Sequence, residues 1–407
     1  MSAVETAVAE AHRRGWAEVL ATVARLTRDL DEAEDAVQEA FESALRTWGR
    51  TGVPRNPVAW ITTAARRKAV DRARRRSTIQ RRLPLLIVPD ADDPPPPGSL
   101  RDDRLRLIFT CCHPALAPQT SVALTLRLVC GLHVPEIARL FLVAERTMAA
   151  RLTRAKKKIH QAGIPYRIPA DHELPERLPA VLAVVSLLFT EGHTSTAGTE
   201  LTRPELLDQS LELARLLVRL IPDEPETLGL LALLLLLDSR REARVDADGA
   251  LVLLADQDRS RWNHRAIEEG RTLVEQALRR SASRGPGPYA VQAAIAALHT
   301  EPETDWPQIL ALYDILLKAH PSPVATLGRT VAWSMVAGPE AGLAELDRLS
   351  TDPRFASYHR LPAARAEMLT RLGRHEEAQA AYHQAAQAAT NPIERTHLTN
   401  RAHPGPG

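Results

Sequence analysis

The sequence predicts an all-α protein. Runs of alternating β-branched residues are almost absent from its 407 residues, and aromatic residues make up only 4%. Apolar residues instead recur at steps of three and four through most of the chain, which is the spacing of one buried helix face. At this length the chain can form two or three domains.

An acidic helix is predicted over Asp31–Trp48. Seven carboxylates lie between Asp29 and Glu42, with no Lys or Arg among them, and the helix dipole favours acids in the first turns. Gly49 and Gly52 are expected to end this helix. Residues 4–29 are predicted to form a pair of amphipathic helices that packs on it. An acidic helix face suits a basic protein surface.

A basic helix is predicted to follow. Asn56 precedes Pro57, and proline is well suited to the first position of a helix. Between Thr63 and Arg82 there are nine bases and one acid, Asp71. A basic helix of this kind suits a phosphate backbone. For both charge runs, a solvated surface is the alternative interpretation.

Residues 83–99 are predicted to form an extended linker, because prolines such as Pro94–Pro97 cannot continue a helix. Helical periodicity resumes in residues 100–165. A short helix at Val134–Leu140, a turn and a longer basic helix from Glu145 to about Gln161 have the layout of a helix-turn-helix. Glu145–Thr147 would then meet base edges, and the later bases would meet phosphates. A plain helical hairpin is the alternative.

Residues 166–284 are predicted to be a helical extension of unknown role. The run Leu228–Leu237 is strongly apolar but about half the length of a membrane span, so a buried helix is expected. The predicted helices are Leu178–Phe189, Arg203–Leu220, Glu224–Asp238, Gly249–Leu254 and Arg265–Arg280.

Residues 285–400 become repetitive. Trp306–Pro323, Gly338–Pro353 and Gly373–Pro392 look like second helices of successive helical hairpins. The last two begin about 35 residues apart, close to the roughly 34-residue period of tetratricopeptide repeats. Such hairpins must stack to bury their apolar faces. A stacked array predicts a surface for a regulatory protein or for an intramolecular contact; a generic helical bundle is the alternative.

The cysteine and histidine residues do not predict a metal site. Cys111, Cys112 and His113 with Cys130 and His133 suggest zinc, but their spacing fits no standard finger. The cysteines are therefore expected to be small core residues. Three cysteines make no disulfide framework, which favours a reducing cytoplasm.

Catalysis is not predicted either. His193 and the segment Asp256–Trp262 are the strongest candidates, yet no nucleophile–base pair, phosphate loop or carboxylate–metal motif surrounds them. We therefore expect no enzyme activity and no cofactor. Met1–Arg14 has no apolar core of the kind that a signal peptide needs, so no membrane targeting is expected.

Two segments resemble a known family. "DEAEDAVQEAFESALRTW…NPVAWITTAARRKAVDRARRR" resembles region 2 of a group 4 (extracytoplasmic-function) sigma factor of bacterial RNA polymerase, and "EIAR…TMAARLTRAKKKI" resembles region 4. The sequence differs from the usual family pattern at Arg67, where many members have Asn, and at Leu142, where a turn Gly is common.

The resemblance implies contacts with the β′ clamp helices and the β flap of the polymerase, the former through Asp35, Gln38 and Glu39. It implies binding to the promoter −10 element, including a flipped base, through Arg50, Arg55, Asn56, Arg66, Arg67, Arg74 and Arg75. For the −35 element it implies Glu145, Arg146, Thr147, Arg151, Arg154, Lys156 and Lys157.

The whole chain is similar to a subgroup of these sigma factors with a large C-terminal extension. The implied domains are region 2 at 1–82, region 4 at 100–165 and a helical extension from 166 that ends in tetratricopeptide-like repeats. The implied function is to direct core RNA polymerase to specific promoters, under control of the extension. The alternatives are a stand-alone helix-turn-helix regulator that binds a palindrome as a dimer, and a repeat scaffold that binds no DNA. Only the sigma interpretation needs the acidic helix for binding.

Overall fold

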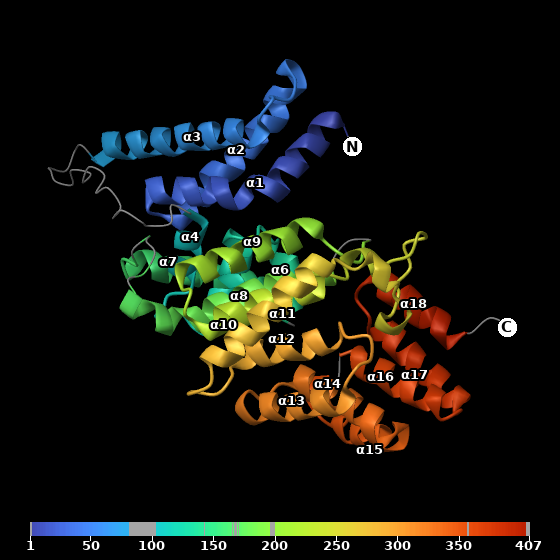
Figure 1. Ribbon diagram of the computed structural model, residues 1–407. Helices are drawn as coiled ribbons and strands as arrows, with labels where there is room; N and C mark the ends of the chain where they lie inside the picture. Colours follow the sequence, from blue (N-terminus) through green and yellow to red (C-terminus); the bar gives the residue numbers. More distant parts are fainter. Residues whose placement is uncertain are drawn as a thin grey trace. The chain divides into compact units, whose positions relative to one another are not determined.

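The computed structural model describes residues 2–80, 103–141, 143–164, 166, 169, 171–195, 200–355 and 358–403. The chain divides into two compact units, Met1–Val184 and Val185–Gly407. Within the described residues the secondary structure is helical, apart from an isolated β-bridge between Val245 and Leu251. The predicted all-α fold is confirmed (Figure 1). The expected linker 83–99 and Leu142 lie outside the described residues.

Three long helices open the first unit, and each packs against the other two: α1 (Ala3–Thr27), α2 (Leu30–Thr51) and α3 (Pro57–Gln80). The Asp29 carboxylate caps α2 by accepting hydrogen bonds from two backbone N–H groups. The side-chain oxygen of Asn56 caps α3 in the same way, by accepting from one backbone N–H group. The predicted acidic and basic helices are confirmed, but Gly49 does not end the acidic helix, because α2 continues to Thr51 and Gly52 caps it. The predicted helix pair over residues 4–29 is wrong, because α1 is continuous; Gly15 lies inside it and packs closely on Val58 of α3.

The rest of the first unit contains a helix-turn-helix. The helices of this part of the unit are α4 (Asp103–Cys111), α5 (Pro118–Leu128), α6 (Val134–Leu140) and α7 (Glu145–Gln161). The helix-turn-helix consists of α6 and α7. Ile137, Met148 and Leu152 are buried between them. The bounds of α6 and α7 agree with the sequence expectation.

The cysteines lie in the core of this unit. Cys111, Cys112 and Cys130 are free thiols and all three are buried. The Cys112 Sγ lies 3.7 Å from the Thr125 hydroxyl oxygen. Burial raises the pKa of Cys112 to about 12, so this thiol is unreactive at neutral pH. The prediction of core packing is confirmed.

The helix α8 (Leu174–His193) runs from the first unit into the second. There, α10 (Pro225–Asp238) packs against α9 (Pro204–Leu220), α11 (His264–Arg280) and α12 (Pro288–Leu298). The apolar run of α10 is buried, as predicted. A Cβ atom on Gly229 would lie 2.5 Å from the backbone nitrogen of Ala290, so glycine allows α10 and α12 to approach closely. Among the described residues, no helix is both long enough and apolar enough to span a membrane.

One predicted helix in this part of the chain is wrong. Gly249–Leu254 forms a turn and a β-bridge, followed by a short 3₁₀ helix at Leu254–Asp256. The Asp246 carboxylate accepts the backbone N–H groups of Asp248 and Ala250, and Gly249 has a positive φ of 79°. This local hydrogen bonding favours a turn over a helix.

The C-terminal helices follow one another in a stack: α13 (Trp306–Ala319), α14 (Pro323–Ala337), α15 (Pro339–Leu349), α16 (Arg360–Arg371), α17 (His375–Ala388) and α18 (Pro392–Ala402). Each packs against the next one in the chain, and α14 also contacts α16. The segments predicted as second helices of hairpins contain α13, α15 and α17. This is the arrangement expected of stacked tetratricopeptide-like hairpins.

Candidate polymerase and promoter interfaces

One side of α2 faces α3. Arg72 of α3 forms ion pairs with Asp35, at 3.1 Å, and with Glu39, and Lys68 reaches Glu39 at 3.3 Å. The hydrogen bond from Arg72 lowers the pKa of Glu39 below its ordinary value. Asp35 and Glu39 keep 62% and 42% of their side chains exposed, and Gln38 between them is exposed. The three residues expected to bind polymerase therefore share an accessible surface.

A second side of α2 faces the helix-turn-helix. Glu34 is buried, and its two carboxylate oxygens lie 2.5 Å from Arg127 of α5 and 3.0 Å from Lys156 of α7. Lys156 also reaches Asp31 at 2.5 Å. Burial alone would lower the pKa of Lys156, but the Glu34 and Asp31 carboxylates outweigh it and raise the pKa. The Lys156 ammonium group therefore stays protonated inside the first unit.

Aromatic and polar contacts extend this interface. Trp16 of α1 is buried, and its ring centroid lies 4.9 Å from that of His12 and 5.7 Å from the Arg127 guanidinium. His12 in turn stacks on His133, which precedes α6. The Tyr166 hydroxyl donates to the backbone oxygen of Ala21 at 3.0 Å. In this conformation the two halves of the first unit are held together by both charge and packing.

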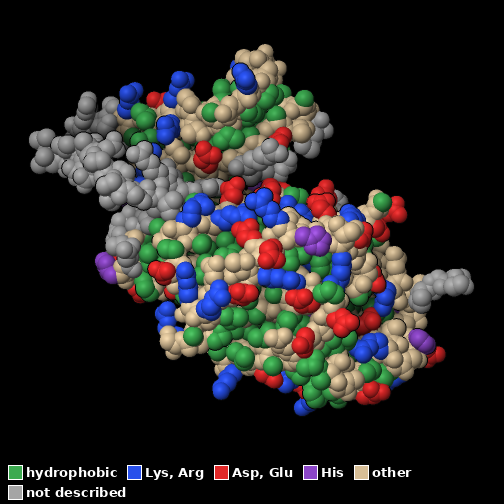
Figure 2. All heavy atoms as spheres, in the orientation of Figure 1, with side chains coloured by type: hydrophobic (Ala, Val, Ile, Leu, Met, Phe, Trp, Pro, Cys, Tyr) green, Lys and Arg blue, Asp and Glu red, His purple; other side chains and the backbone are tan. Residues whose placement is uncertain are grey.

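The residues expected at the −10 element lie on the surface. Arg50, Arg55 and Asn56 are exposed around the loop between α2 and α3. Arg66, Arg67 and Arg74 are exposed along α3, and Lys and Arg side chains line the surface over this helix (Figure 2). The side chain of Arg75 lies outside the described residues. Asn56 also has a structural role, since its side chain caps α3.

The residues expected at the −35 element divide into two groups. Glu145, Arg146 and Thr147 are exposed in the first turn of α7, where a recognition helix meets base edges. Arg154 and Lys157 are exposed further along, and Arg151 is half-buried. Lys156 is turned towards α2. Among the expected DNA contacts whose side chains the structure describes, Lys156 is the one that is paired with acids of α2.

Sequence reasoning missed the partners of these charges. Lys68 and Arg72 belong to the basic run in the sequence, but in the structure they neutralise the acids of α2. The sequence places Glu34 in the acidic run but does not distinguish it from its neighbours, and it does not indicate a role for Arg127. The one available signal is helical spacing, because Asp31 lies three residues before Glu34 and four residues before Asp35 in the same helix.

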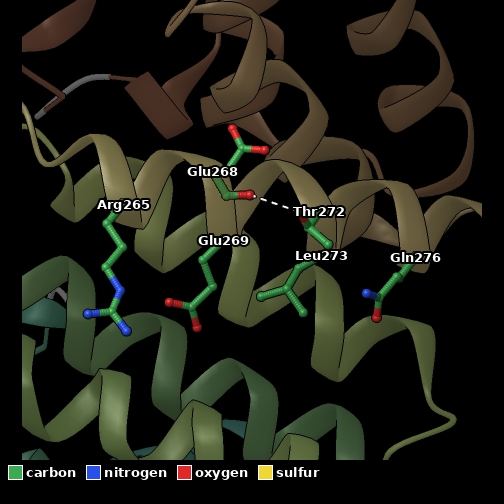
Figure 3. Close-up of a pocket in the computed structure, with 6 residues that line it drawn as sticks. All are labelled: Arg265, Glu268, Glu269, Thr272, Leu273 and Gln276. Carbon is green, nitrogen blue, oxygen red and sulfur yellow. Dashed lines mark hydrogen bonds between the residues drawn. The ribbon is translucent and has the colours of Figure 1, made fainter.

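A shallow groove lies on α11 of the second unit. It has a volume of about 490 Å³ and its lining side chains all come from one helix (Figure 3): Arg265, Glu268, Glu269, Thr272, Leu273 and Gln276. Glu269 pairs with Arg215 of α9 at 3.5 Å. The groove is open and mixes both signs of charge, which is typical of a solvated helix surface.

Comparisons with known proteins agree with this geometry. Residues 13–79 match the family model "Sigma-70 region 2", residues 106–159 match "Sigma-70, region 4", and residues 177–278 match a family of unknown function, DUF6596. An uncharacterized protein of Rhizobium meliloti (strain 1021) is 43% identical over 392 residues, which cover 94% of this chain and 92% of the relative. The crystal structure of the yeast Tom70 aligns with 92% of this chain and 80% of the Tom70 chain, at 12% sequence identity. Its TM-score of 0.36 is too low to support a conclusion.

Regions 2 and 4 together imply binding to core RNA polymerase and to promoter DNA, and hence a sigma-like role in transcription initiation. Sigma factor families are not enzymes. The α1–α3 and α4–α7 helices supply the two regions in the order that the family requires. The chain therefore belongs to the extracytoplasmic-function sigma factors and carries a C-terminal helical extension.

Proposed function

We propose that this sigma factor directs core RNA polymerase to specific promoters and that Asp35, Gln38 and Glu39 bind the polymerase β′ clamp helices. The exposed acidic surface of α2 carries this proposal. Asp35 and Glu39 are already paired with bases of α3, so a basic surface on the polymerase would meet carboxylates that are fixed in place. The same ion pairs join the proposed docking surface on α2 to α3, the helix that carries arginines expected at the −10 element.

The promoter contacts follow from exposure and charge. Arg66, Arg67 and Arg74 would track the backbone of a melted strand, and the loop around Arg55 and Asn56 would hold an unstacked base. The first turn of α7 would read the −35 element in the major groove. Region 4 would also contact the β flap. Each DNA contact alone is weak and salt-dependent, so specificity requires both elements to be held by the polymerase.

The ion pairs of Lys156 suggest how binding is controlled. With Lys156 paired to Asp31 and Glu34, α7 is held against α2, beside the surface proposed for the polymerase. We infer that this closed arrangement binds DNA poorly and that polymerase binding favours separation of the two regions. The C-terminal helical stack would bias the same equilibrium, by binding a regulatory protein or by an intramolecular contact.

Gel filtration of the full chain with core RNA polymerase tests the docking surface. The wild type should co-elute with polymerase, and the Asp35→Lys/Glu39→Lys variant should not. Because those substitutions also disturb the pairs with α3, Gln38→Lys provides a second variant, in which an exposed residue is changed. The control is Glu268→Lys/Glu275→Lys on the exposed side of α11. Co-elution of the charge-reversed α2 variants with wild-type affinity would disprove this docking surface.

A further inference from the structure

Two sequence segments that the sigma function does not explain meet in the second unit. Thr190–Ser195 ends α8, and Arg240–Arg244 follows α10. Arg244 is buried, and its guanidinium donates hydrogen bonds to the backbone oxygen of His193 and, at 3.3 Å, to the Thr194 hydroxyl. The Asn391 amide at the start of α18 donates to the backbone oxygens of Ser195 and Glu200, at 2.8 and 3.1 Å. Helices from both ends of the unit thus fix the segment that contains His193.

The residues that follow α12 are connected to the residues that follow α10. The backbone N–H of Asn263 donates to the backbone oxygen of Ser239, next to Arg240, at 2.8 Å. A few residues earlier in the same segment, Arg259 donates to the backbone oxygen of Glu301, just after His299. Asp258–Asn263 therefore bridges the residues after α10 and the residues after α12. This bridging role gives a structural explanation for a segment in which the sequence predicts no catalysis.

The basic residues gathered here outnumber their acidic partners. Arg241 pairs with Asp208 and Asp238, and Arg360 pairs with Glu394 at 3.6 Å. By contrast, Arg240 and Arg244 form no ion pair with any carboxylate in the described part of the chain. The Glu394 and Asp238 carboxylates offset part of the desolvation of Arg244, whereas no described carboxylate offsets that of Arg240. Burial lowers the pKa of Arg240, and burial together with Arg240 lowers that of Arg244 to about 10.

Two imidazoles near these arginines each have one ring nitrogen without a hydrogen-bond partner in the described chain. His193 Nε2 and His299 Nδ1 are buried, and neither has a hydrogen-bond partner among the described residues. Burial, followed by neighbouring arginines that include Arg240, lowers the pKa of both. A neutral imidazole can still donate one hydrogen bond. Where the unpartnered nitrogen carries the proton, it needs an acceptor, and an acceptor close to Arg240 and Arg244 is favoured when it also carries negative charge.

We propose that Arg240, Arg244, His193 and His299 form a binding site for a small oxyanion. Guanidinium groups bind the paired oxygens of phosphate or carboxylate in a bidentate manner, and the imidazoles would supply further donors. A buried water could satisfy the imidazoles, but it would leave the Arg240 charge without an opposite charge. The charge balance thus favours an anion over water. This site belongs to the C-terminal extension and is independent of the promoter and polymerase surfaces.

Isothermal titration calorimetry of the full chain tests the site, with inorganic phosphate, sulfate and succinate in separate arms against sodium chloride at equal ionic strength. The wild type should bind at least one oxyanion at a single site. Arg240→Gln should weaken that binding tenfold or more. The matched control Arg279→Gln removes an exposed arginine, paired only with Glu275 on the same helix, and should bind as the wild type does. The phosphate and succinate arms distinguish a phosphoryl ligand from a carboxylate ligand.

Thermal unfolding separates a ligand site from a structural arginine. At a hundredfold excess over Kd, the oxyanion should raise the Tm of the wild type by roughly 5–10 °C and should not raise that of Arg240→Gln. Without anion, Arg240→Gln should unfold at or above the wild-type Tm, because no ion pair is lost. The proposal is overturned if no oxyanion binds the wild type, or if Arg240→Gln binds with unchanged affinity.

Discussion

The Lys156 Nζ of α7 lies 3.0 Å from the Glu34 Oε2 of α2, across 122 residues of sequence. Glu34 is only 6% exposed, and its other oxygen is bound by Arg127. A buried carboxylate between two bases is stabilised only while both are present. This contact links the helix proposed for polymerase docking to the helix proposed for −35 recognition, so we expect the two surfaces to be energetically coupled.

Replacing Lys156 with Met tests that coupling. The variant keeps most of the apolar stem and removes the ammonium group, which leaves Glu34 with Arg127 alone. We expect the free energy of unfolding of the first unit to fall by about 1–3 kcal/mol, as measured by urea denaturation. The exposed neighbour Lys157→Met should change it by less than about 0.5 kcal/mol. Equal effects of the two substitutions would contradict the buried pair.

Removing the acids of α2 should release α7. In Asp31→Asn/Glu34→Gln, the closed arrangement loses its ion pairs with Lys156, and a larger fraction of molecules can bind DNA. Fluorescence anisotropy with a labelled duplex at low salt should show roughly threefold or greater tightening, since apparent affinity scales with the competent fraction. Glu42→Gln, an exposed acid on the same helix, is the control. Unchanged affinity in the double variant would show that the ion pairs do not withhold α7.

The exposed bases of α7 should act through counterion release. Lys157→Gln should reduce the slope of log K against log salt concentration by about 0.9 on any duplex, which corresponds to one phosphate contact. The measurement is a salt titration of DNA binding from low to physiological ionic strength. Arg279→Gln in α11 removes a base of the second unit and should leave the slope unchanged. If Lys157→Gln gives the wild-type slope, Lys157 does not contact phosphate.

The same substitution should have opposite effects at two glycines. Gly229→Ala places a methyl group 2.5 Å from the backbone of Ala290, and we expect it to cost about 1–3 kcal/mol by overpacking. Gly49 lies inside α2 with nothing within 4 Å of an added Cβ. Gly49→Ala should therefore stabilise by about 0.5–1 kcal/mol, because alanine loses less backbone entropy. Thermal unfolding of both variants provides the comparison, and destabilisation of equal size would refute the packing argument.

Local spacing carried most of the fold prediction. The bounds of α6 and α7 follow from apolar residues at steps of three and four, and the start of α3 follows from Asn56 and Pro57. Contacts between residues that are distant in sequence produce no local sequence pattern. The pairing of Glu34 with Lys156 requires two helices to meet in three dimensions, and neither residue's neighbours specify the other. The exposed acids and bases of the candidate site were predictable, whereas the residues that fix their geometry were not.

Protonation of His299 should limit stability in acid. Its pKa falls from 6.5 to about 4 in the folded chain, through burial first and the Arg240 charge second. Between these values the unfolded chain binds more protons, so stability rises with pH and is lost as the pH falls from 6.5 towards 4. His299→Phe should remove roughly 2–3 kcal/mol of this pH dependence, measured by denaturation of the second unit across that range. A bound oxyanion would favour the charged imidazole, so saturating phosphate should flatten the wild-type profile as well. A His299→Phe profile as steep as that of the wild type would assign the dependence to His193 instead.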